Sequence, residues 1–146
     1  MPEHPDVRQN NSFDCGPAVV LSVCRYWGVP ASFNRVVQQV GCTSIDGTDP
    51  RSIESFFRNS GFYVCSGSMT IDDLKHSVKL GRSVIALIQY GVGHWVAINK
   101  LFRKLVIFQD PWEGLRSEKV DDFDRLWHDV DRFGTVYDHF GISVWR

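Results

Sequence analysis

The sequence lacks the segments that would direct a chain into or across a membrane. Its first residues, M-P-E-H-P-D-V-R, have no basic start followed by an apolar run, so we expect no secretory signal. The longest apolar run, residues 83–90, has the length of a strand and falls far short of the ~20 residues that a membrane-spanning helix needs. We therefore expect a cytoplasmic protein with no membrane segment in this chain.

The sequence also lacks an excess of charge of either sign. Sixteen Lys and Arg residues balance 17 Asp and Glu residues, which gives a net charge of -1 and excludes a broad field that would attract nucleic acid. The tightest basic group, Lys100, Arg103 and Lys104, flanks an expected hairpin turn, and we interpret it as a solvated turn. No linker, repeat or low-complexity stretch divides the chain, so we predict a single domain over residues 1–146.

Metal and nucleotide motifs are absent as well. The four cysteines share no C-x-x-C spacing, and no H-E-x-x-H is present, so we expect no metal site. The G-V-G of residues 91–93 falls between two expected strands and not before a helix, which argues against a nucleotide site. Without a secretory signal, we expect the cysteines to be reduced thiols.

Hydrophobic spacing predicts helices in the first half of the chain and strands in the second. Apolar residues cover most of the surface of a helix over residues 14–27, which indicates that this helix is buried. Asp14 is expected to cap it, Pro17 falls in its first turn, and Gly28 ends it. Further helices are predicted over residues 32–40, 49–61, 70–81 and 120–131.

Short β-branched runs predict the strands. A first strand is expected at F-Y-V-C-S (62–66), and an antiparallel meander at residues 83–90, 94–99 and 105–109. G-I-S-V-W (141–145) is expected to close the chain as a last strand. Helices followed by strands indicate an α+β fold.

Cys15, in Q-N-N-S-F-D-C-G-P-A, is the strongest candidate for a nucleophile. It lies at the start of the buried helix, where unpaired backbone N–H groups favour negative charge and therefore the thiolate that attacks carbonyl carbons. Gly16 beside it would let a substrate backbone approach. Cys24, Cys42 and Cys65 have no such setting, and we interpret them as small packed residues.

His94 and Asp110 are the candidates for a base and its partner. His94, in G-H-W-V-A-I, begins a strand, and Asp110, in I-F-Q-D-P-W, ends the next one. Neighbouring strands of a hairpin could bring the carboxylate to the imidazole and hold its tautomer. If His94 and Val96 face a cleft, then Trp95 faces the core. His4, His76, His128 and His139 have no comparable partner, and we interpret them as packed or exposed residues.

Other residues near these candidates are expected to contact the substrate. We name Gly16, Gly93 and Trp95 as substrate-binding residues because they flank Cys15 and His94. The amide of Gln9 could stabilise an oxyanion together with the backbone N–H of Cys15. The residue types alone do not favour Gln9 over Gln38 or Gln109.

These motifs together resemble the peptidase C39 family. The resemblance rests on Q-x5-C-G-x-A, the G-T-D-P-R-S-I segment (47–53), H-[aromatic]-V-x-[aliphatic], D-P sixteen residues after the histidine, and V-D-D-F-D-R-L-W, and it covers nearly the whole chain. It implies a papain-like cysteine protease fold. It also implies that Cys15 is the nucleophile, His94 the base, Asp110 the residue that orients it, and Gln9 the oxyanion donor.

The resemblance further implies cleavage of a peptide or protein substrate after a Gly-Gly leader, without a cofactor, and allows an ABC exporter as a partner. Pro17 after Cys15-Gly16 is found in broader relatives, and whether the chain is a stand-alone enzyme or an excised domain stays open. Two alternatives also stay open. One is a peptide-docking module of an export system that does not cut. The other is an amidase or acyl-transfer enzyme of a toxin or phage, acting on another protein or a cell-wall peptide.

Overall fold

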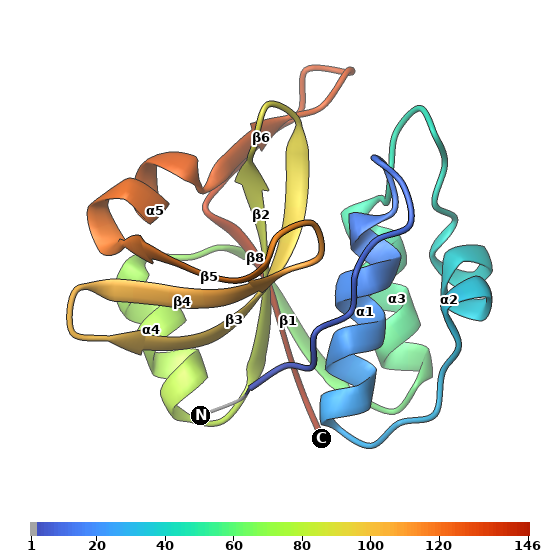
Figure 1. Ribbon diagram of the computed structural model, residues 1–146, viewed down its shortest axis with the longest axis horizontal. Helices are drawn as coiled ribbons and strands as arrows, with labels where there is room; N and C mark the ends of the chain where they lie inside the picture. Colours follow the sequence, from blue (N-terminus) through green and yellow to red (C-terminus); the bar gives the residue numbers. More distant parts are fainter. Residues whose placement is uncertain (1–2) are drawn as a thin grey trace.

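The computed structural model describes residues 3–146, and its largest element is a six-stranded antiparallel sheet with helices against both faces (Figure 1). The strand order is β1-β8-β2-β3-β4-β5, so the last strand lies between β1 and β2. A hairpin of β6 and β7 forms a second, two-stranded sheet. The helices are α1 (Cys15–Tyr26), α2 (Phe33–Val40), α3 (Pro50–Asn59), α4 (Ile71–Lys79) and α5 (Val120–Leu126). The strands are β1 (Tyr63–Ser68), β2 (Ser83–Gln89), β3 (Gly93–Phe102), β4 (Leu105–Asp110), β5 (Gly114–Lys119), β6 (His128–Val130), β7 (Val136–Asp138) and β8 (Phe140–Trp145).

The predicted α+β fold and the antiparallel meander of β2, β3 and β4 are confirmed. The helix starts follow from local chemistry. Asp49 accepts a hydrogen bond at the start of α3 with Pro50 at its first position, and Thr70 and Asp73 form a capping box at α4. Local signals therefore place these helices before any tertiary contact is considered.

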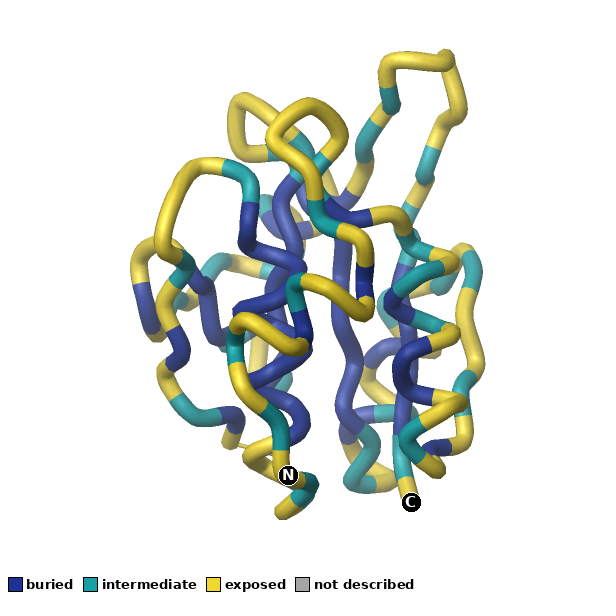
Figure 2. Tube along the Cα trace, turned by 90° about the vertical axis from the view of Figure 1, so that its right-hand side faces the viewer, coloured by how far each residue is buried: buried dark blue, intermediate teal, exposed yellow. Residues whose placement is uncertain are grey.

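Two hydrophobic clusters sandwich the sheet. On β2, Ile85 and Leu87 face a cluster with α1, α2 and α3, whereas Val84, Ala86 and Ile88 face a cluster with α4 and α5. Because both faces are covered, the run is apolar throughout and does not alternate with polar residues. Figure 2 shows buried residues along the central strands and exposed ones in the connections.

The clusters correct one expectation for β3. Trp95 packs in the core with α1, as predicted. Val96, however, does not face a cleft: it is fully buried in the cluster with α4 and α5. The expectation failed because it assumed that the opposite face of the sheet is open.

The helix predicted over residues 120–131 is also corrected. It ends at Leu126, and the chain continues as β6, which pairs with β7. Trp127 enforces the change of direction: its side chain is fully buried, its indole N–H donates to the carbonyl of Phe140, and its own carbonyl accepts from the N–H of His139. These long-range bonds outweigh the local helical preference.

Strand β5 was not predicted. Its sequence, G-L-R-S-E-K, is polar and charged, which is unusual for a strand. It pairs only with β4 and forms an edge of the sheet, where charged residues are tolerated. This strand carries Arg116, whose position matters for the site.

The segment before α1 is anchored by His4. The backbone N–H and the ring Nδ1–H of His4 donate to Asn99 (2.9 and 2.8 Å), and its Nε2 accepts from Ser83 (2.8 Å). Burial lowers the pKa of His4 to about 4, more than the hydrogen bond to Asn99 raises it. The neutral ring therefore fixes this segment against β2 and β3.

Candidate active site

Cys15 is the first residue of α1, and it is almost buried, with 7% of its surface exposed. Helix α1 packs against β3, which brings Cys15 beside His94, the second residue of that strand. Cys24 is fully buried on the same helix, and burial raises the pKa of its thiol to about 11. All four cysteines are free thiols, but Cys15 alone, among the described residues, is a cysteine that lies beside a histidine and at a helix start.

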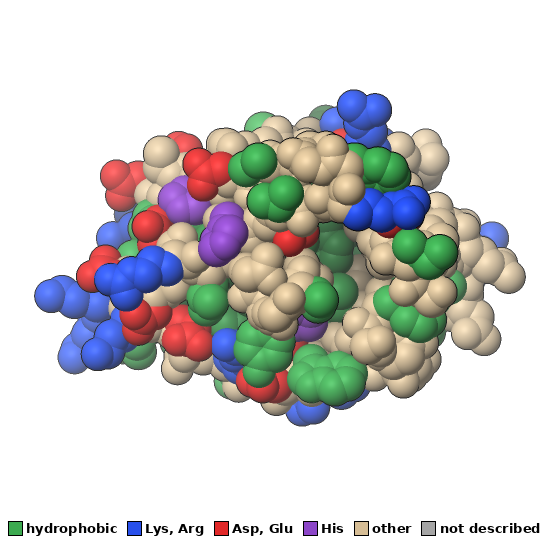
Figure 3. Space-filling model, turned by 90° about the horizontal axis from the view of Figure 1, so that it is seen from above, with side chains coloured by type: hydrophobic (Ala, Val, Ile, Leu, Met, Phe, Trp, Pro, Cys, Tyr) green, Lys and Arg blue, Asp and Glu red, His purple; other side chains and the backbone are tan. Residues whose placement is uncertain are grey.

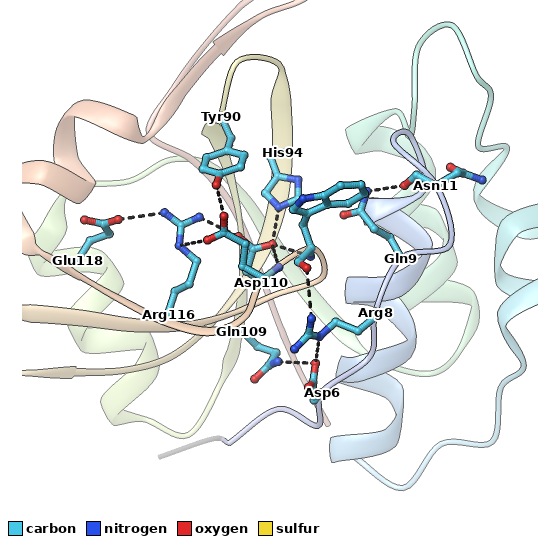
Figure 4. Close-up of polar contacts among 12 residues, drawn as sticks. Asp6, Arg8, Gln9, Asn11, Tyr90, His94, Gln109, Asp110, Arg116 and Glu118 are labelled. Carbon is cyan, nitrogen blue, oxygen red and sulfur yellow. Dashed lines mark hydrogen bonds and ion pairs between the residues drawn. The ribbon is translucent and has the colours of Figure 1, made fainter.

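His94 and Asp110 form a buried pair (Figure 4). The Nε2–H of His94 donates to Oδ1 of Asp110 at 2.7 Å, and the side chains are 7% and 0% exposed. With Nε2 committed to the carboxylate, Nδ1 is the ring nitrogen that can face Cys15. The predicted pairing of these strand ends is therefore present in the structure.

The charges of this pair stabilise each other. Burial of the imidazole opposes its charge, but hydrogen bonds and charge interactions with Asp110 and Cys15 outweigh burial and raise the pKa of His94 to about 9. Burial likewise opposes the Asp110 carboxylate, yet His94 and the hydrogen bond from Arg116 hold the pKa of Asp110 far below its usual range. At neutral pH the pair is thus an imidazolium and a carboxylate.

The segment with Gln9 lies beside the same site. Asp14 was expected to cap α1 with its side chain, and this is wrong: its carboxylate instead accepts from the backbone N–H groups of Asn10 and Asn11, both at 3.0 Å. The N–H of Gln9 donates to the carbonyl of Pro111 at 2.9 Å, next to Asp110. Asp14 and Pro111 therefore hold the Gln9 loop between the start of α1 and the end of β4.

The amide of Gln9 is only partly engaged. Its Nε2 donates to the carbonyl of Asn11 at 2.6 Å, which uses one of two N–H bonds. Its Oε1 is buried, and within residues 3–146 it has no hydrogen-bond partner. One N–H of this amide thus remains available for another acceptor.

The three predicted substrate-binding residues have packing partners that their local sequence did not reveal. A Cβ atom at Gly16 would overlap the side chain of Thr48, and one at Gly93 would overlap the carboxylate of Asp129. Trp95 is 3% exposed, and its indole N–H donates to the carbonyl of Thr48 at 3.3 Å. Tight packing alone explains why glycine is found at both positions. Substrate contact by Gly16, Gly93 and Trp95 stays a prediction.

Gly93→Ala is expected to lower the free energy of unfolding by about 1–3 kcal/mol, because the new methyl group must displace the Asp129 carboxylate. Asp129→Ala removes all three contacting atoms, so the double variant should regain the lost stability. Urea denaturation of the wild type, both single variants and the double variant measures this. If the double variant is stable but still inactive, Gly93 is needed for substrate approach and not only for packing.

Two residues of the site were missed from sequence. Arg116 on β5 donates from Nη1 to Oδ2 of Asp110 at 2.8 Å. Asp129 on β6 lies against Gly93 and accepts from the side-chain amide of Gln89 at 3.2 Å; burial raises the pKa of Asp129. Neither residue lies in a motif, and only their strand pairing brings them here.

The face of the molecule above this site carries exposed hydrophobic side chains (Figure 3). They come from the α2–α3 and β2–β3 connections and from the β6–β7 hairpin: Ile45, Tyr90, Val92, Val130, Phe133 and Val136. Arg132 and Asp46 link the first and last of these connections by an ion pair of 2.7 Å. Within residues 3–146, no cluster of three or more metal-binding side chains occurs, and no helix is long and apolar enough to cross a membrane.

Comparison of the sequence with known proteins identifies a family and a relative. The sequence profile of the peptidase C39 family matches residues 3–131. A protein of Methanothermobacter marburgensis described as uncharacterized is 26% identical over 121 residues, which cover 82% of this chain and 80% of that protein.

Solved structures share the fold. The chain superposes on a double glycine motif protease from an AMS/PCAT transporter, solved with its leader peptide, with a TM-score of 0.79, 18% identity, and coverage of 98% of this chain and 91% of that one. The peptidase domain of Streptococcus ComA, a bifunctional ABC transporter of a quorum-sensing pathway, gives a TM-score of 0.72, 18% identity, and coverage of 98% and 97%. The papain-like fold is therefore shown.

Proposed function

Because this chain belongs to the peptidase C39 family, we propose that it is a cysteine peptidase that cleaves leader peptides after a Gly-Gly pair. One observation carries the proposal: Cys15, at the start of α1, lies beside a histidine that is itself hydrogen-bonded to a fully buried aspartate. A thiol, an imidazole and an orienting carboxylate are the groups that acyl transfer requires.

The proposed reaction begins with attack of the Cys15 thiolate on the peptide carbonyl. The resulting oxyanion is stabilised by the backbone N–H of Cys15 and the free amide N–H of Gln9. His94, charged at neutral pH because its pKa is about 9, gives its proton to the leaving amine. Water then attacks the thioester, His94 accepts a proton from it, and the thiol is released.

The preference for glycine is supported by how little of the site is exposed. Cys15 and His94 are 7% and 5% exposed, so a substrate must reach the thiol with its backbone. Glycine residues, which have no side chain, let the substrate backbone approach the thiol at the lowest steric cost. The neighbouring structures include a protease named for its double glycine motif, which agrees with this preference.

The partner and the compartment follow from the same proposal. Both neighbouring structures come from transporters, and one of these is a bifunctional ABC transporter, so we propose that the substrate is an exported peptide and that an ABC exporter is the partner. The cytoplasm is the compartment that keeps Cys15 a thiol.

Peptides that carry Gly-Gly, Gly-Ala or Ala-Ala before the same bond test the proposal. We expect cleavage after Gly-Gly to be at least ~10-fold faster than after Gly-Ala, because one added methyl group in a narrow site costs that much or more. Mass spectrometry identifies the cut bonds. Binding of all three peptides without cleavage would favour a docking module, and cleavage at unrelated bonds would contradict the leader specificity.

A further inference from the structure

Arg116 lies on the edge strand β5, yet its side chain is only 14% exposed. Its guanidinium contacts three carboxylates: Asp110 at 2.8 Å, Glu118 at 2.9 Å and Glu113 at 3.4 Å (Figure 4). The strand pairing places Arg116 opposite Phe108 on β4, two residues before Asp110. A cation is therefore held beside the carboxylate that orients His94.

The hydrogen bonds of Asp110 are divided unequally between its two oxygens. Oδ1 accepts from His94 (2.7 Å) and from the backbone N–H groups of Trp112 (2.7 Å) and Glu113 (3.3 Å). In the described part of the chain, Oδ2 accepts from Arg116 alone. Since Asp110 is fully buried, loss of Arg116 would leave a buried carboxylate oxygen without a donor.

Arg116 also contacts the residue that flanks the other side of His94. The Tyr90 ring lies 5.8 Å from the His94 ring, at an interplanar angle of 32°. The Arg116 guanidinium lies over Tyr90, 4.9 Å from the ring centre, and the Tyr90 hydroxyl donates to Glu113, which pairs with Arg116. One side chain thus touches both neighbours of the imidazole.

We propose that Arg116 is a positioning residue for peptide-bond cleavage, an inference that rests on the proposed function. It fixes the plane of the Asp110 carboxylate through Oδ2, so that Oδ1 stays aligned with the Nε2–H of His94. It also holds Tyr90 against the imidazole. The ring therefore keeps Nδ1 directed to Cys15, and small losses of such alignment cost up to ~100-fold in rate.

A role only in stability is the competing explanation, because Arg116 joins three carboxylates at a sheet edge. The two explanations differ in coupling. A residue that acts through Asp110 has no further effect once Asp110 no longer orients His94, whereas an independent stabilising contact keeps its effect. A double-mutant cycle on Arg116 and Asp110 separates them.

The cycle compares the wild type, Arg116→Met, Asp110→Ala and the double variant, because alanine removes both oxygens that contact His94 and Arg116. Methionine keeps the length of the arginine stem and removes the charge and donors. Two rates are measured: cleavage of a Gly-Gly peptide, and alkylation of Cys15 by iodoacetamide relative to the exposed Cys65. We expect Arg116→Met alone to lower kcat by ~10- to 100-fold with KM unchanged, to slow alkylation, and to cost nothing further in the Asp110→Ala background.

Two further variants sharpen the result. Arg116→Lys restores one charged donor and should recover part of kcat. Arg125→Met removes the matched exposed ion pair with Asp122 on α5 and should leave both rates unchanged. Equal losses from Arg116→Met in both backgrounds, or a loss of thermal stability with normal kcat, would overturn the proposal. If the alkylation rates of Cys15 show the expected coupling but even the wild type does not cleave the peptide, the proposed function is wrong. The positioning role of Arg116 is then still supported.

Discussion

Cys15→Ala is expected to abolish peptide-bond cleavage and to leave the fold intact. Cys15 is the thiol that lies both beside His94 and at a helix start, so no other cysteine is placed to replace it as the nucleophile. Alanine is smaller than cysteine by one sulfur atom and favours helices, so the free energy of unfolding should change by less than about 1 kcal/mol. Peptide cleavage followed by mass spectrometry, with thermal unfolding by circular dichroism, measures both expectations.

Cys24→Ala is the matched control, because it makes the same change on the same helix. Cys24 is fully buried, and burial raises the pKa of its thiol to about 11, which keeps the thiol protonated at neutral pH. This variant should lose some stability, through a small cavity, and keep its activity. Full activity of Cys15→Ala, or inactivity of Cys24→Ala in a folded protein, would sink the assignment of the nucleophile.

His94→Ala is expected to lower kcat by ~100- to 10,000-fold, the usual contribution of a general acid and base. Asp110→Asn should be milder. The position of Oδ1 is surrounded by three N–H donors, so an asparagine would place its carbonyl oxygen there and keep the bond to His94. Its amide would then face Arg116, donor against donor, which explains why some activity is lost.

Steady-state kinetics of the two variants, with a peptide that contains Gly-Gly, gives the comparison. If Asp110→Asn is the more damaging change, then Asp110 does more than orient His94, and the proposed division of roles is wrong.

The pH dependence of peptide cleavage by the wild type tests the charge of His94. Because the pKa of His94 is raised to about 9, its charged form persists at neutral pH and is lost above pH 9, where activity should fall.

Much of the site could be predicted because its chemistry has local signatures. Cys15 begins a helix whose surface is mostly covered by apolar residues. His94 and Asp110 lie at the ends of adjacent strands of a hairpin. These features depend on short stretches of sequence and on the geometry of a meander. Gln9 differs, since the family resemblance singled it out, and its loop is now found beside Pro111.

Other parts of the site could not be predicted because their partners are distant in sequence. Asp14 looked like a helix cap, but it holds the Gln9 loop instead. Gly93 was chosen for substrate approach, and the structure adds a packing reason for this glycine: Asp129 occupies the space where a Cβ would lie. In each case, a residue type with a common local role is used for a contact that only folding creates.

Local sequence signals were enough to place α1 to α4 and the meander. They also singled out Cys15, His94 and Asp110, the residues that the proposed peptidase needs. Folding alone supplies what surrounds these residues: the edge strand that brings Arg116 to Asp110, the hairpin behind Gly93, and the complete burial of Asp110. The two kinds of feature differ because helix capping, hydrophobic periodicity and chain reversal depend on a few neighbouring residues. Burial and ion pairing depend on which distant segments meet, and no local pattern records that.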